Sequence, residues 1–255
     1  MLAADERDRI PRLASSYLTW ESSSLPDSTF KSLSNTDLEA AFHASAHVLH
    51  YIADYEWFRR VNCLYAELRQ RRGANESVHL KMHSLLIKLR MFAEANALRA
   101  SEGLSVGVLP KIDSESRKKQ GILRITGEGG AQWVPWLYTE GIEIVAYVSP
   151  TCAHSRRAMQ AIINEPRFRW LDGNVRFVVP RSSTWPATGV EAWNALNPLN
   201  PLLNQAGPTG WEALDVYETP VFHLVSNGKR LQTIVGWQRE GAELLDLRAL
   251  FETER

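Results

Sequence analysis

The sequence predicts an α/β domain, a mixed sheet with flanking helices, preceded by an all-α N-terminal domain. Apolar residues recur at helical spacing over much of 36–99. After about residue 121, short β-favouring runs alternate with helical segments, a pattern typical of strands joined by crossover helices. Near the C-terminus, Asn227-Gly228 separates two more β-favouring runs, and this dipeptide is a strong hairpin signal. We therefore expect two domains, 1–105 and 106–255.

Composition excludes several classes of protein. The chain has 255 residues, 44% of them hydrophobic, which is enough apolar surface to form a core. Its 29 basic and 29 acidic side chains balance, which argues against a dedicated nucleic-acid binder. No run of ~18 apolar residues is present, so no transmembrane segment is expected. Two cysteines, Cys63 and Cys152, are too few for a disulfide-stapled scaffold or a four-cysteine zinc ribbon.

The N-terminal domain is expected to be a helical hairpin. Thr36-Asp37-Leu38-Glu39 has the spacing of a capping box and predicts a helix that continues to about residue 72. Gly73 is expected to end this helix in the left-handed conformation. Asn75 is expected to cap a second helix that reaches about residue 99.

Two irregular segments border this hairpin. Residues 1–35 are rich in serine, with a short helix expected near 13–20. Their first residues contain no apolar core that would form a signal peptide, so a cytoplasmic protein and a chain whose signal has been removed both stay open. Residues 103–121 contain glycine, proline and the basic run Arg117-Lys118-Lys119, which favours an inter-domain linker.

The C-terminal domain begins with alternating strands and helices. The expected strands are 122–125, 142–148, 175–179, 221–225 and 230–237, and the expected helices are 131–138, 152–164 and 241–254. Because crossover helices join parallel strands, the first three strands are predicted to be parallel and the final hairpin to add an antiparallel edge. A segment rich in tryptophan and proline at about 181–218 is interpreted as a helical insertion.

A cysteine stands where a buried strand is predicted to turn into a helix, in Ser149-Pro150-Thr151-Cys152-Ala153-His154-Ser155. The first turn of a helix presents free amides and a partial positive charge, both of which stabilise a thiolate. A neighbouring imidazole, from His154, adds to this effect. The alternative is that Cys152 is a small, packed and unreactive residue.

This segment resembles the active site of the thioredoxin superfamily, especially the bacterial Dsb-type disulfide oxidoreductases and isomerases, in which strand-Pro-Thr-Cys-x-His-Cys is common. The resemblance covers about 106–255 and implies a thioredoxin-like fold. It includes Thr219-Pro220 before the hairpin, since in that family this peptide bond is cis, faces the cysteine and offers its backbone to the substrate. The implied site residues are Cys152, His154 and Ser155 for catalysis, and Thr151, Thr219 and Pro220 for substrate binding.

The chain departs from the family pattern in three places. Ser155 replaces the resolving cysteine, so the C-x-x-S motif forms no internal disulfide. Ala146 stands where the family has a buried acid that assists proton transfer to the resolving thiol. The segment between Cys152 and Pro220 is longer than in minimal thioredoxins, and its excess is expected to wall a binding groove. That segment contains Trp185, Trp193, Pro198, Pro201 and Trp211.

A lone thiolate leaves several functions open. Cys152 can attack a substrate disulfide, hold the mixed disulfide and be released by a second protein thiol or by glutathione. It can also capture a protein partner without turnover. The alternative is a non-catalytic scaffold, since thioredoxin-like proteins of conjugation and secretion systems resemble this arrangement. The resemblance implies a periplasmic or otherwise extracytoplasmic protein, with the cytoplasm as the alternative, and no cofactor.

The second cysteine and the histidines allow further hypotheses. Cys63 lies in the middle of a predicted helix, where a packed structural role is favoured. If it meets Cys152, it becomes a resolving thiol. One arc of the first helix carries His43, His47, His50 and Asp54, and the second helix carries His79 and His83. Such spacing can bind zinc or copper, but a solvated polar face or a domain contact is the favoured interpretation, so no metal site is predicted.

Overall fold

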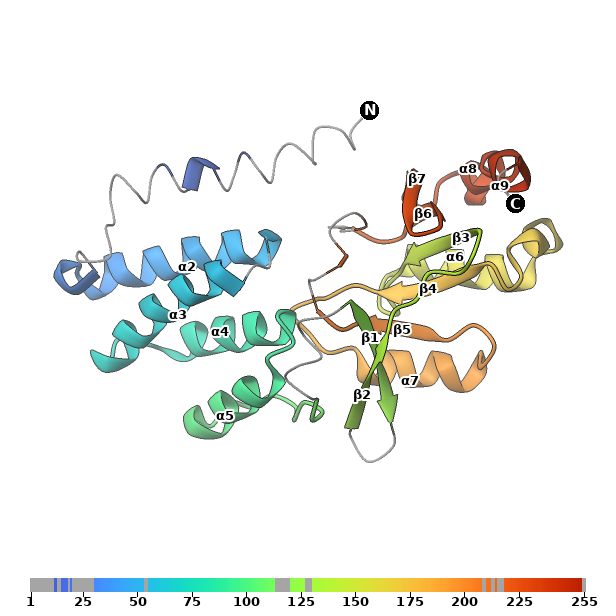
Figure 1. Cartoon of the computed structure of the whole chain (residues 1–255). Helices are drawn as coiled ribbons and strands as arrows, with labels where there is room; N and C mark the ends of the chain where they lie inside the picture. Colours follow the sequence, from blue (N-terminus) through green and yellow to red (C-terminus); the bar gives the residue numbers. More distant parts are fainter. Residues whose placement is uncertain are drawn as a thin grey trace. The chain divides into compact units, whose positions relative to one another are not determined.

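The structure is a computed structural model. It describes residues 12, 15–17, 19, 30–52, 55–112, 120–126, 130–207, 210–211, 214 and 218–253. The chain divides into two compact units, Met1–Pro110 with Ser182–Thr184, and Lys111–Arg181 with Trp185–Arg255 (Figure 1). Of the short helix expected at 13–20, residues 15–17 and 19 are described and are helical, and the other half lies outside the described residues, as does the basic run 117–119.

The first unit is helical, as predicted, but its helices are shorter and more numerous than expected. It contains η1 (Phe30–Ser32), α2 (Asn35–Ile52), α3 (Tyr55–Gln70), α4 (Glu76–Lys88) and α5 (Phe92–Glu102) (Figure 1). The single helices predicted at 36–72 and 75–99 were therefore wrong, because each of these stretches holds two helices.

Two helices are followed by an arginine in the position that usually holds glycine, and the end of α4 was missed for this reason. After α4, Arg90 has φ 60°, and the Arg90 and Met91 amides donate to the Ile87 and Leu86 carbonyls. After α3, Arg72 has φ 55°, and the Arg72 and Gly73 amides donate to the Arg69 and Leu68 carbonyls. These are the paired bonds of the Schellman motif. The left-handed residue after α3 is thus Arg72, and the prediction for Gly73 was wrong.

The helix starts were predicted with mixed success. Asn75 caps α4 as predicted, since its Oδ1 accepts from the Val78 amide at 3.0 Å. At α2, the capping hydroxyl belongs to Ser34, two residues before the predicted Thr36. Ser34 Oγ accepts from the Asp37 amide at 3.1 Å and donates to the Asp37 carboxylate at 2.6 Å. Ser34 therefore satisfies one orphan amide of the first turn, and the Asp37 carboxylate accepts from the Ser34 hydroxyl instead of a backbone amide.

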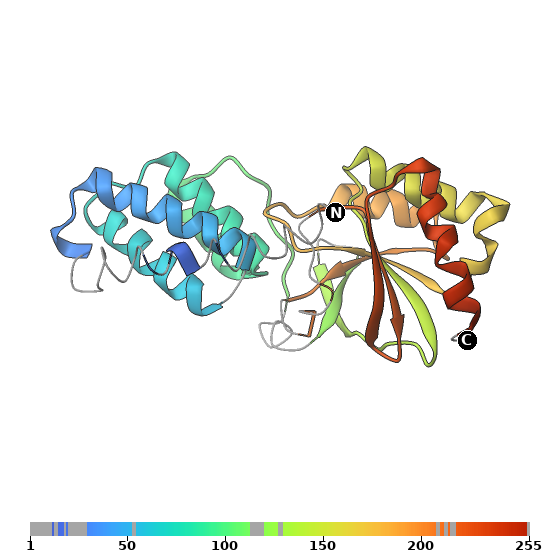
Figure 2. The ribbon, with the colours of Figure 1, turned by 90° about the horizontal axis from the view of Figure 1, so that it is seen from above.

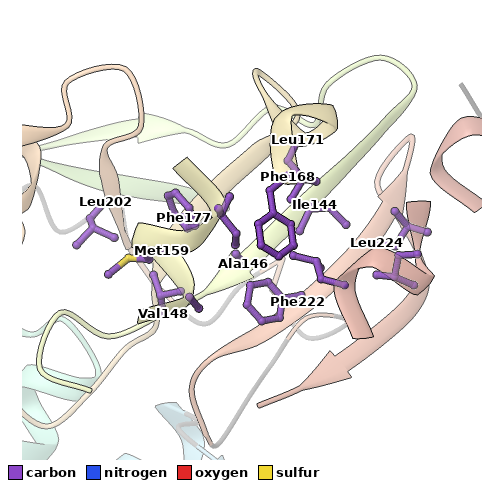
Figure 3. Close-up of a cluster of buried hydrophobic side chains, with 14 of the residues drawn as sticks. Ile144, Ala146, Val148, Met159, Phe168, Leu171, Phe177, Leu202, Phe222 and Leu224 are labelled. Carbon is purple, nitrogen blue, oxygen red and sulfur yellow. The ribbon is translucent and has the colours of Figure 1, made fainter. Parts of the chain in front are cut away.

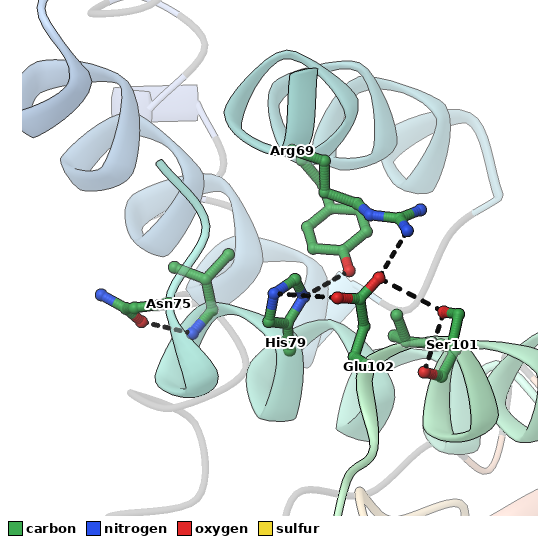
Figure 4. Close-up of polar contacts among 8 residues, drawn as sticks. Arg69, Asn75, His79, Ser101 and Glu102 are labelled. Carbon is green, nitrogen blue, oxygen red and sulfur yellow. Dashed lines mark hydrogen bonds and ion pairs between the residues drawn. The ribbon is translucent and has the colours of Figure 1, made fainter. Parts of the chain in front are cut away.

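A polar network joins α3, α4 and α5, from buried Tyr65 and His79 to exposed Arg69 and Ser101 (Figure 4). The His79 ring nitrogen Nδ1 lies 2.7 Å from the Tyr65 hydroxyl, and Nε2 lies 3.5 Å from the Glu102 carboxylate. Glu102 also binds Arg69 and the Ser101 hydroxyl. Burial of the Tyr65 ring is the main reason why the pKa of Tyr65 is raised to about 12. His79 therefore has a structural role that links three helices.

The second unit is built on a seven-stranded sheet with the order β2-β1-β5-β4-β3-β6-β7. Its strands are β1 (Gly121–Thr126), β2 (Gly130–Pro135), β3 (Ile142–Tyr147), β4 (Val175–Val179), β5 (Leu202–Gln205), β6 (Val221–Ser226) and β7 (Lys229–Val235). Its helices are α6 (Ala153–Asn164), η3 (Pro166–Leu171), α7 (Ala187–Leu196), η5 (Arg239–Gly241), α8 (Ala242–Asp246) and α9 (Arg248–Thr253).

Most of the predicted strands are confirmed, with one error of type. β3 and β4 are parallel, and β6 and β7 form the predicted antiparallel hairpin around Asn227-Gly228, both of which have positive φ. The helix expected at 131–138 was wrong, because β2 occupies this stretch and pairs with β1. Since β1 is also antiparallel to β5, the first strand is not parallel to the next two, contrary to prediction.

Pairing with β1 makes β2 a strand, although its local sequence was interpreted as a helix. Its Trp133 lies over Gly121, where an added Cβ would come within 2.2 Å of the indole Nε1. β2 is the edge strand of the sheet, and such a strand tolerates Pro135, which pairs with Gly121 at its end. Glycine in one strand and tryptophan in the next thus fit each other across the hairpin.

One face of the sheet is covered by helices and holds the larger core (Figures 2 and 3). Ala146, Phe177 and Phe222 of the sheet are fully buried against Met159 of α6 and Phe168 of η3. Burying each large apolar side chain contributes about 1.5–3 kcal/mol. This packing fixes α6, and with it the residue at its N-terminus, against the end of β3.

Candidate functional site

Cys152 occupies the N-cap of α6. The preceding strand β3 is buried at every position, so the chain leaves the sheet at a fixed point. A short turn follows, in which the Cys152 amide donates to the Ser149 carbonyl and the Ser149 and Thr151 hydroxyls lie 2.9 Å apart. Cys152 itself has extended φ and ψ, and its carbonyl accepts from Arg156 at 3.0 Å as the helix begins. The sulfur therefore lies at the positive end of a 12-residue helix.

Thr219 and Pro220 lie beside this sulfur. The Thr219-Pro220 peptide bond is cis, and the Cys152 thiol donates to the Thr219 carbonyl at 3.5 Å across 67 sequence positions. Pro220 is buried, and its carbonyl accepts from the Gly236 amide at 2.8 Å. The structure thus brings together the cysteine and the Thr-Pro pair that the sequence pattern connected.

The surroundings of Cys152 favour the thiolate. Partial burial of the sulfur acts to raise the pKa of Cys152, but hydrogen bonds from the Ser155 amide and hydroxyl, the His154 amide and the Thr219 side chain outweigh it. The pKa of Cys152 is consequently lowered from its ordinary value. The neutral thiol makes no capping hydrogen bond, so the first-turn amides act on the charged form.

Ser155 and His154 act on the sulfur in different ways. Ser155 is fully buried, and among the described residues its Oγ has no hydrogen-bond partner of ordinary geometry. A hydroxyl turns freely about its C–O bond, so Oγ can donate to the sulfur once charge develops there. The His154 side chain is exposed, and its contribution to the lowered pKa comes from the backbone amide instead of the expected imidazole.

Thr151 belongs to the cysteine turn, and the insertion is built differently from what its sequence suggested. The exposed Thr151 takes part in the turn before Cys152 through its bonds with Ser149. The insertion contains α7 and β5, and β5 lies between β1 and β4 inside the sheet. Trp193 packs against Phe177 on the helix-covered face, and Trp211 is buried on the other face. These two tryptophans are core residues, so they do not wall a groove as predicted.

A close approach that sequence reasoning missed connects the insertion to the cysteine turn. A Cβ added to Gly189 of α7 would lie 3.0 Å from Pro150 Cβ, two residues before Cys152. Only the absence of a side chain at Gly189 lets α7 pack this tightly. A glycine in the middle of a helix-forming stretch was the available signal, because such a glycine costs about 1 kcal/mol relative to alanine.

Cys63 is exposed on α3, so the favoured interpretation of a packed cysteine was wrong. Both cysteines are free thiols. Cys63 belongs to the first unit and Cys152 to the second.

The histidines of the first unit form no metal site in the described part of the chain. No group of three or more histidine, cysteine or acidic side chains there is placed to hold an ion, and Asp54 lies outside the described residues. His47 is exposed, and His43 and His50 are half-buried. Burial, with the nearby charges of Lys88, Lys81 and His47, lowers the pKa of His50 to about 4.

The second pair of histidines is buried, so it does not form a solvated face. His79 belongs to the network with Tyr65 and Glu102. Burial, together with the nearby Arg99, lowers the pKa of His83.

Across the ranges that the structure covers, no helix combines the length and the apolar character needed to cross a bilayer.

Comparison with known proteins gives weak similarities. No family model matches the chain, and no curated protein matches it. Among solved structures, it is similar to an uncharacterized thioredoxin-like protein from Porphyromonas gingivalis, with 21% identity and a TM-score of 0.39 over 54% of this chain and 92% of that one. It is also similar to a thioredoxin-like protein from Bacteroides caccae ATCC 43185, with 12% identity and a TM-score of 0.31 over 82% of this chain and 77% of that one.

Identities and TM-scores this low do not establish a fold, so the fold is assigned from the strand order and the contacts of this chain itself. The sheet has a parallel β3–β4 pair and an antiparallel β6–β7 hairpin. Cys152 begins the helix after β3, and the cis peptide bond before Pro220 faces it. The chain is an α/β protein with an N-terminal helical region and a thioredoxin-like domain.

Proposed function

We propose that Cys152 is the nucleophile of a monothiol thiol–disulfide exchange reaction on a protein partner. The observation that supports this most strongly is the contact of the sulfur with the Thr219 carbonyl, at a helix N-terminus where the pKa of Cys152 is lowered. A partly exposed thiolate at such a site is the reactive form of cysteine.

The exchange proceeds in two balanced steps. The Cys152 thiol first loses its proton to solvent, and the thiolate attacks one sulfur of a partner disulfide. A bond forms between Cys152 and that sulfur, the partner's S–S bond breaks, and its other sulfur leaves as a thiolate that takes up a proton. A second thiolate, from the partner or from glutathione, then attacks the mixed disulfide and releases Cys152. One disulfide is consumed and one is formed, so no external oxidant or reductant is needed.

The residues around the sulfur suit an intermediate that persists. Ser155 can donate a hydrogen bond to the thiolate but cannot form a disulfide with it. Ala146 lies in the apolar core and offers no acid for a second thiol. The mixed disulfide therefore persists until an external thiol attacks it. A long-lived mixed disulfide of this kind suits an isomerase-like or client-capturing role. The backbone at Thr219 and Pro220 is the proposed binding edge for the partner strand.

The proposed setting is the periplasm or another extracytoplasmic compartment, where Dsb-like proteins meet disulfides, and the cytoplasm is the alternative. A protein of a secretion or conjugation system is one candidate partner. In the competing scaffold function, the fold would be kept and Cys152 would not react.

Intact-mass analysis after exposure to oxidised glutathione tests the proposal, with the parent, Cys152→Ala and Cys63→Ala compared side by side. Because Cys63 is exposed, it serves as the control thiol within the same chain. We expect one rapidly formed glutathione adduct in the parent and in Cys63→Ala, and none at that rate in Cys152→Ala. A loss of two hydrogens would instead show a Cys63–Cys152 pair. An unreactive Cys152 would favour the scaffold.

A further inference from the structure

A groove of about 540 Å³ runs along the solvent side of α6 and begins at His154, in the first turn of this helix. Its α6 wall includes His154, Arg157, Gln160 and Asn164, which recur at helical spacing. His154 is the second residue after Cys152. From His154 to Asn164 the helix is about 15 Å long, which matches four or five residues of extended polypeptide.

The opposite wall is Trp237, and its position is fixed by the surrounding core. The indole packs against Phe168, with ring centroids 5.8 Å apart, and against Phe222, with centroids 6.0 Å apart. Below it, Gly241 has φ 83°, and an added Cβ would lie 2.2 Å from the indole. Only glycine fits at this position, so the aromatic wall exists before any ligand arrives.

The backbone at the rim of the groove is strained. Arg239 and Glu240, at φ 39° and 55°, lie in the left-handed region directly before Gly241. Each non-glycine residue there costs about 1–2 kcal/mol. The Glu240 carbonyl is held by a hydrogen bond of 2.9 Å from Arg167. Strain of this kind clusters at binding sites, where the surrounding structure maintains it.

The end of the groove near Cys152 is positively charged. α6 has no acidic residue in its first turn, and Arg156 and Arg157 follow directly, although cations near a helix N-terminus oppose its dipole. Arg157 is exposed and makes no ion pair within the described residues. Farther along the groove, Glu165 is neutralised by Arg167 at 2.6 Å. Glu240, beside Arg167, lines the groove as well, so its far end is less positive than its entrance.

We propose that this groove binds the polypeptide segment that flanks the partner's reactive cysteine, and that Arg157 selects an acidic side chain in that segment. The inference rests on the proposed function of Cys152 and extends it to the class of partner. The Gln160 amide offers hydrogen bonds to a peptide backbone, and Trp237 contacts an apolar side chain. An arginine that is unfavourable for its own helix is explained if it binds a partner's carboxylate.

The test measures noncovalent binding in Cys152→Ser protein, so that it does not depend on thiol reactivity. The probes are two rhodamine-labelled nonapeptides with a central serine, one with aspartate and glutamate on both sides and one with lysine in their place. Fluorescence anisotropy gives the Kd of each peptide. Arg157→Glu is compared with Arg156→Glu, which makes the same charge change on the adjacent exposed residue outside the groove lining.

We expect the Cys152→Ser protein to prefer the acidic peptide by roughly fivefold, as one partly screened ion pair allows. Arg157→Glu should abolish or reverse this preference, and Arg156→Glu should change it by less than about twofold. Equal effects of the two substitutions, or no preference for the acidic peptide, would overturn the groove assignment. Reaction of the Cys63→Ala variant with dithiodipyridine, in which Cys152 is the remaining thiol, tests Cys152 separately. An unreactive thiol with an intact peptide preference would refute the exchange reaction and leave the groove standing.

Discussion

The Cys152 sulfur lies 3.5 Å from the carbonyl oxygen of Thr219, although 67 positions separate the two residues in the chain. The contact joins the N-terminus of α6 to the start of β6, and in the proposed reaction this is where a partner strand would pair with the backbone before Pro220 and meet the thiolate. Both residues are fixed by a buried framework, since β3 and β6 are adjacent strands in the sheet.

Ser155→Ala should raise the pKa of Cys152 and so destabilise its thiolate. The substitution removes the hydroxyl that helps to lower the pKa of Cys152 and leaves the first-turn amides in place. The rate of alkylation by iodoacetamide should fall several-fold near pH 6 and stay unchanged near pH 10, where any thiol is ionised. An unchanged rate at the lower pH would show that the amides alone determine the pKa.

Ser155→Cys should restore an internal resolving thiol. Ser155 is one helical turn from Cys152 and fully buried, so the introduced sulfur attacks the mixed disulfide without diffusing to it. The glutathione adduct of Cys152 should become short-lived, and the protein should lose two hydrogens instead, because the effective concentration of such a neighbour is about millimolar or higher. Time-resolved intact mass measures this, and a persistent adduct would contradict the geometry.

Gly189→Val should disturb the cysteine turn from α7. The new side chain has no room beside Pro150, so the turn before Cys152 must shift. We expect slower alkylation of Cys152 and a destabilisation of about 1–3 kcal/mol, as for other overpacked sites. Thr188→Val, at the exposed neighbouring position, is the matched control and should leave both quantities nearly unchanged. Identical alkylation rates in the two variants would show that α7 does not position the turn.

Arg72→Gly should stabilise the first unit. Arg72 is exposed and has φ 55°, a conformation that glycine adopts without steric cost. The expected gain in the free energy of unfolding is about 1 kcal/mol. Gln70→Gly, at the last residue of α3, should instead cost up to about 1 kcal/mol because this position is helical. Urea unfolding of the two variants should therefore give changes of opposite sign.

His50→Gln should make the thermal stability of the protein less sensitive to acid. The pKa of His50 is about 4 in the folded protein, against 6.5 for an ordinary histidine, so the unfolded chain binds the proton first. Stability is therefore lost as the pH falls from about 6.5 to about 4. The parent should lose more Tm than His50→Gln across that window, and equal losses would mean that His50 is not protected from protonation.

The sequence was most informative where local chemistry decides the structure. The Asn227-Gly228 hairpin and the turn from a buried strand into the helix at Cys152 were predicted because a few adjacent residues specify each one, whereas the cis Thr219-Pro220 bond was expected from the family resemblance alone. The end of α4 before Arg90 was missed, and Gly73 was chosen in place of Arg72 after α3, because arginine gives no sign of a left-handed conformation.

Features that depend on distant residues were also missed. β2 is a strand because β1 lies beside it, and Trp211 is buried by residues far from it in the chain. The groove beside α6 is formed by a helix and a loop that are remote in sequence. Its one local signal was the Arg156-Arg157 pair close to a helix start.

The central claim is that the fold activates Cys152, and the pH profile of its alkylation tests this most directly. The rate is followed on the Cys152 peptide by mass spectrometry, in the native protein and in the same protein unfolded in urea. The native profile should reach its midpoint at a lower pH than the unfolded one, since the amides at the start of α6 act only in the folded state. A native midpoint equal to or above the unfolded one would contradict the account.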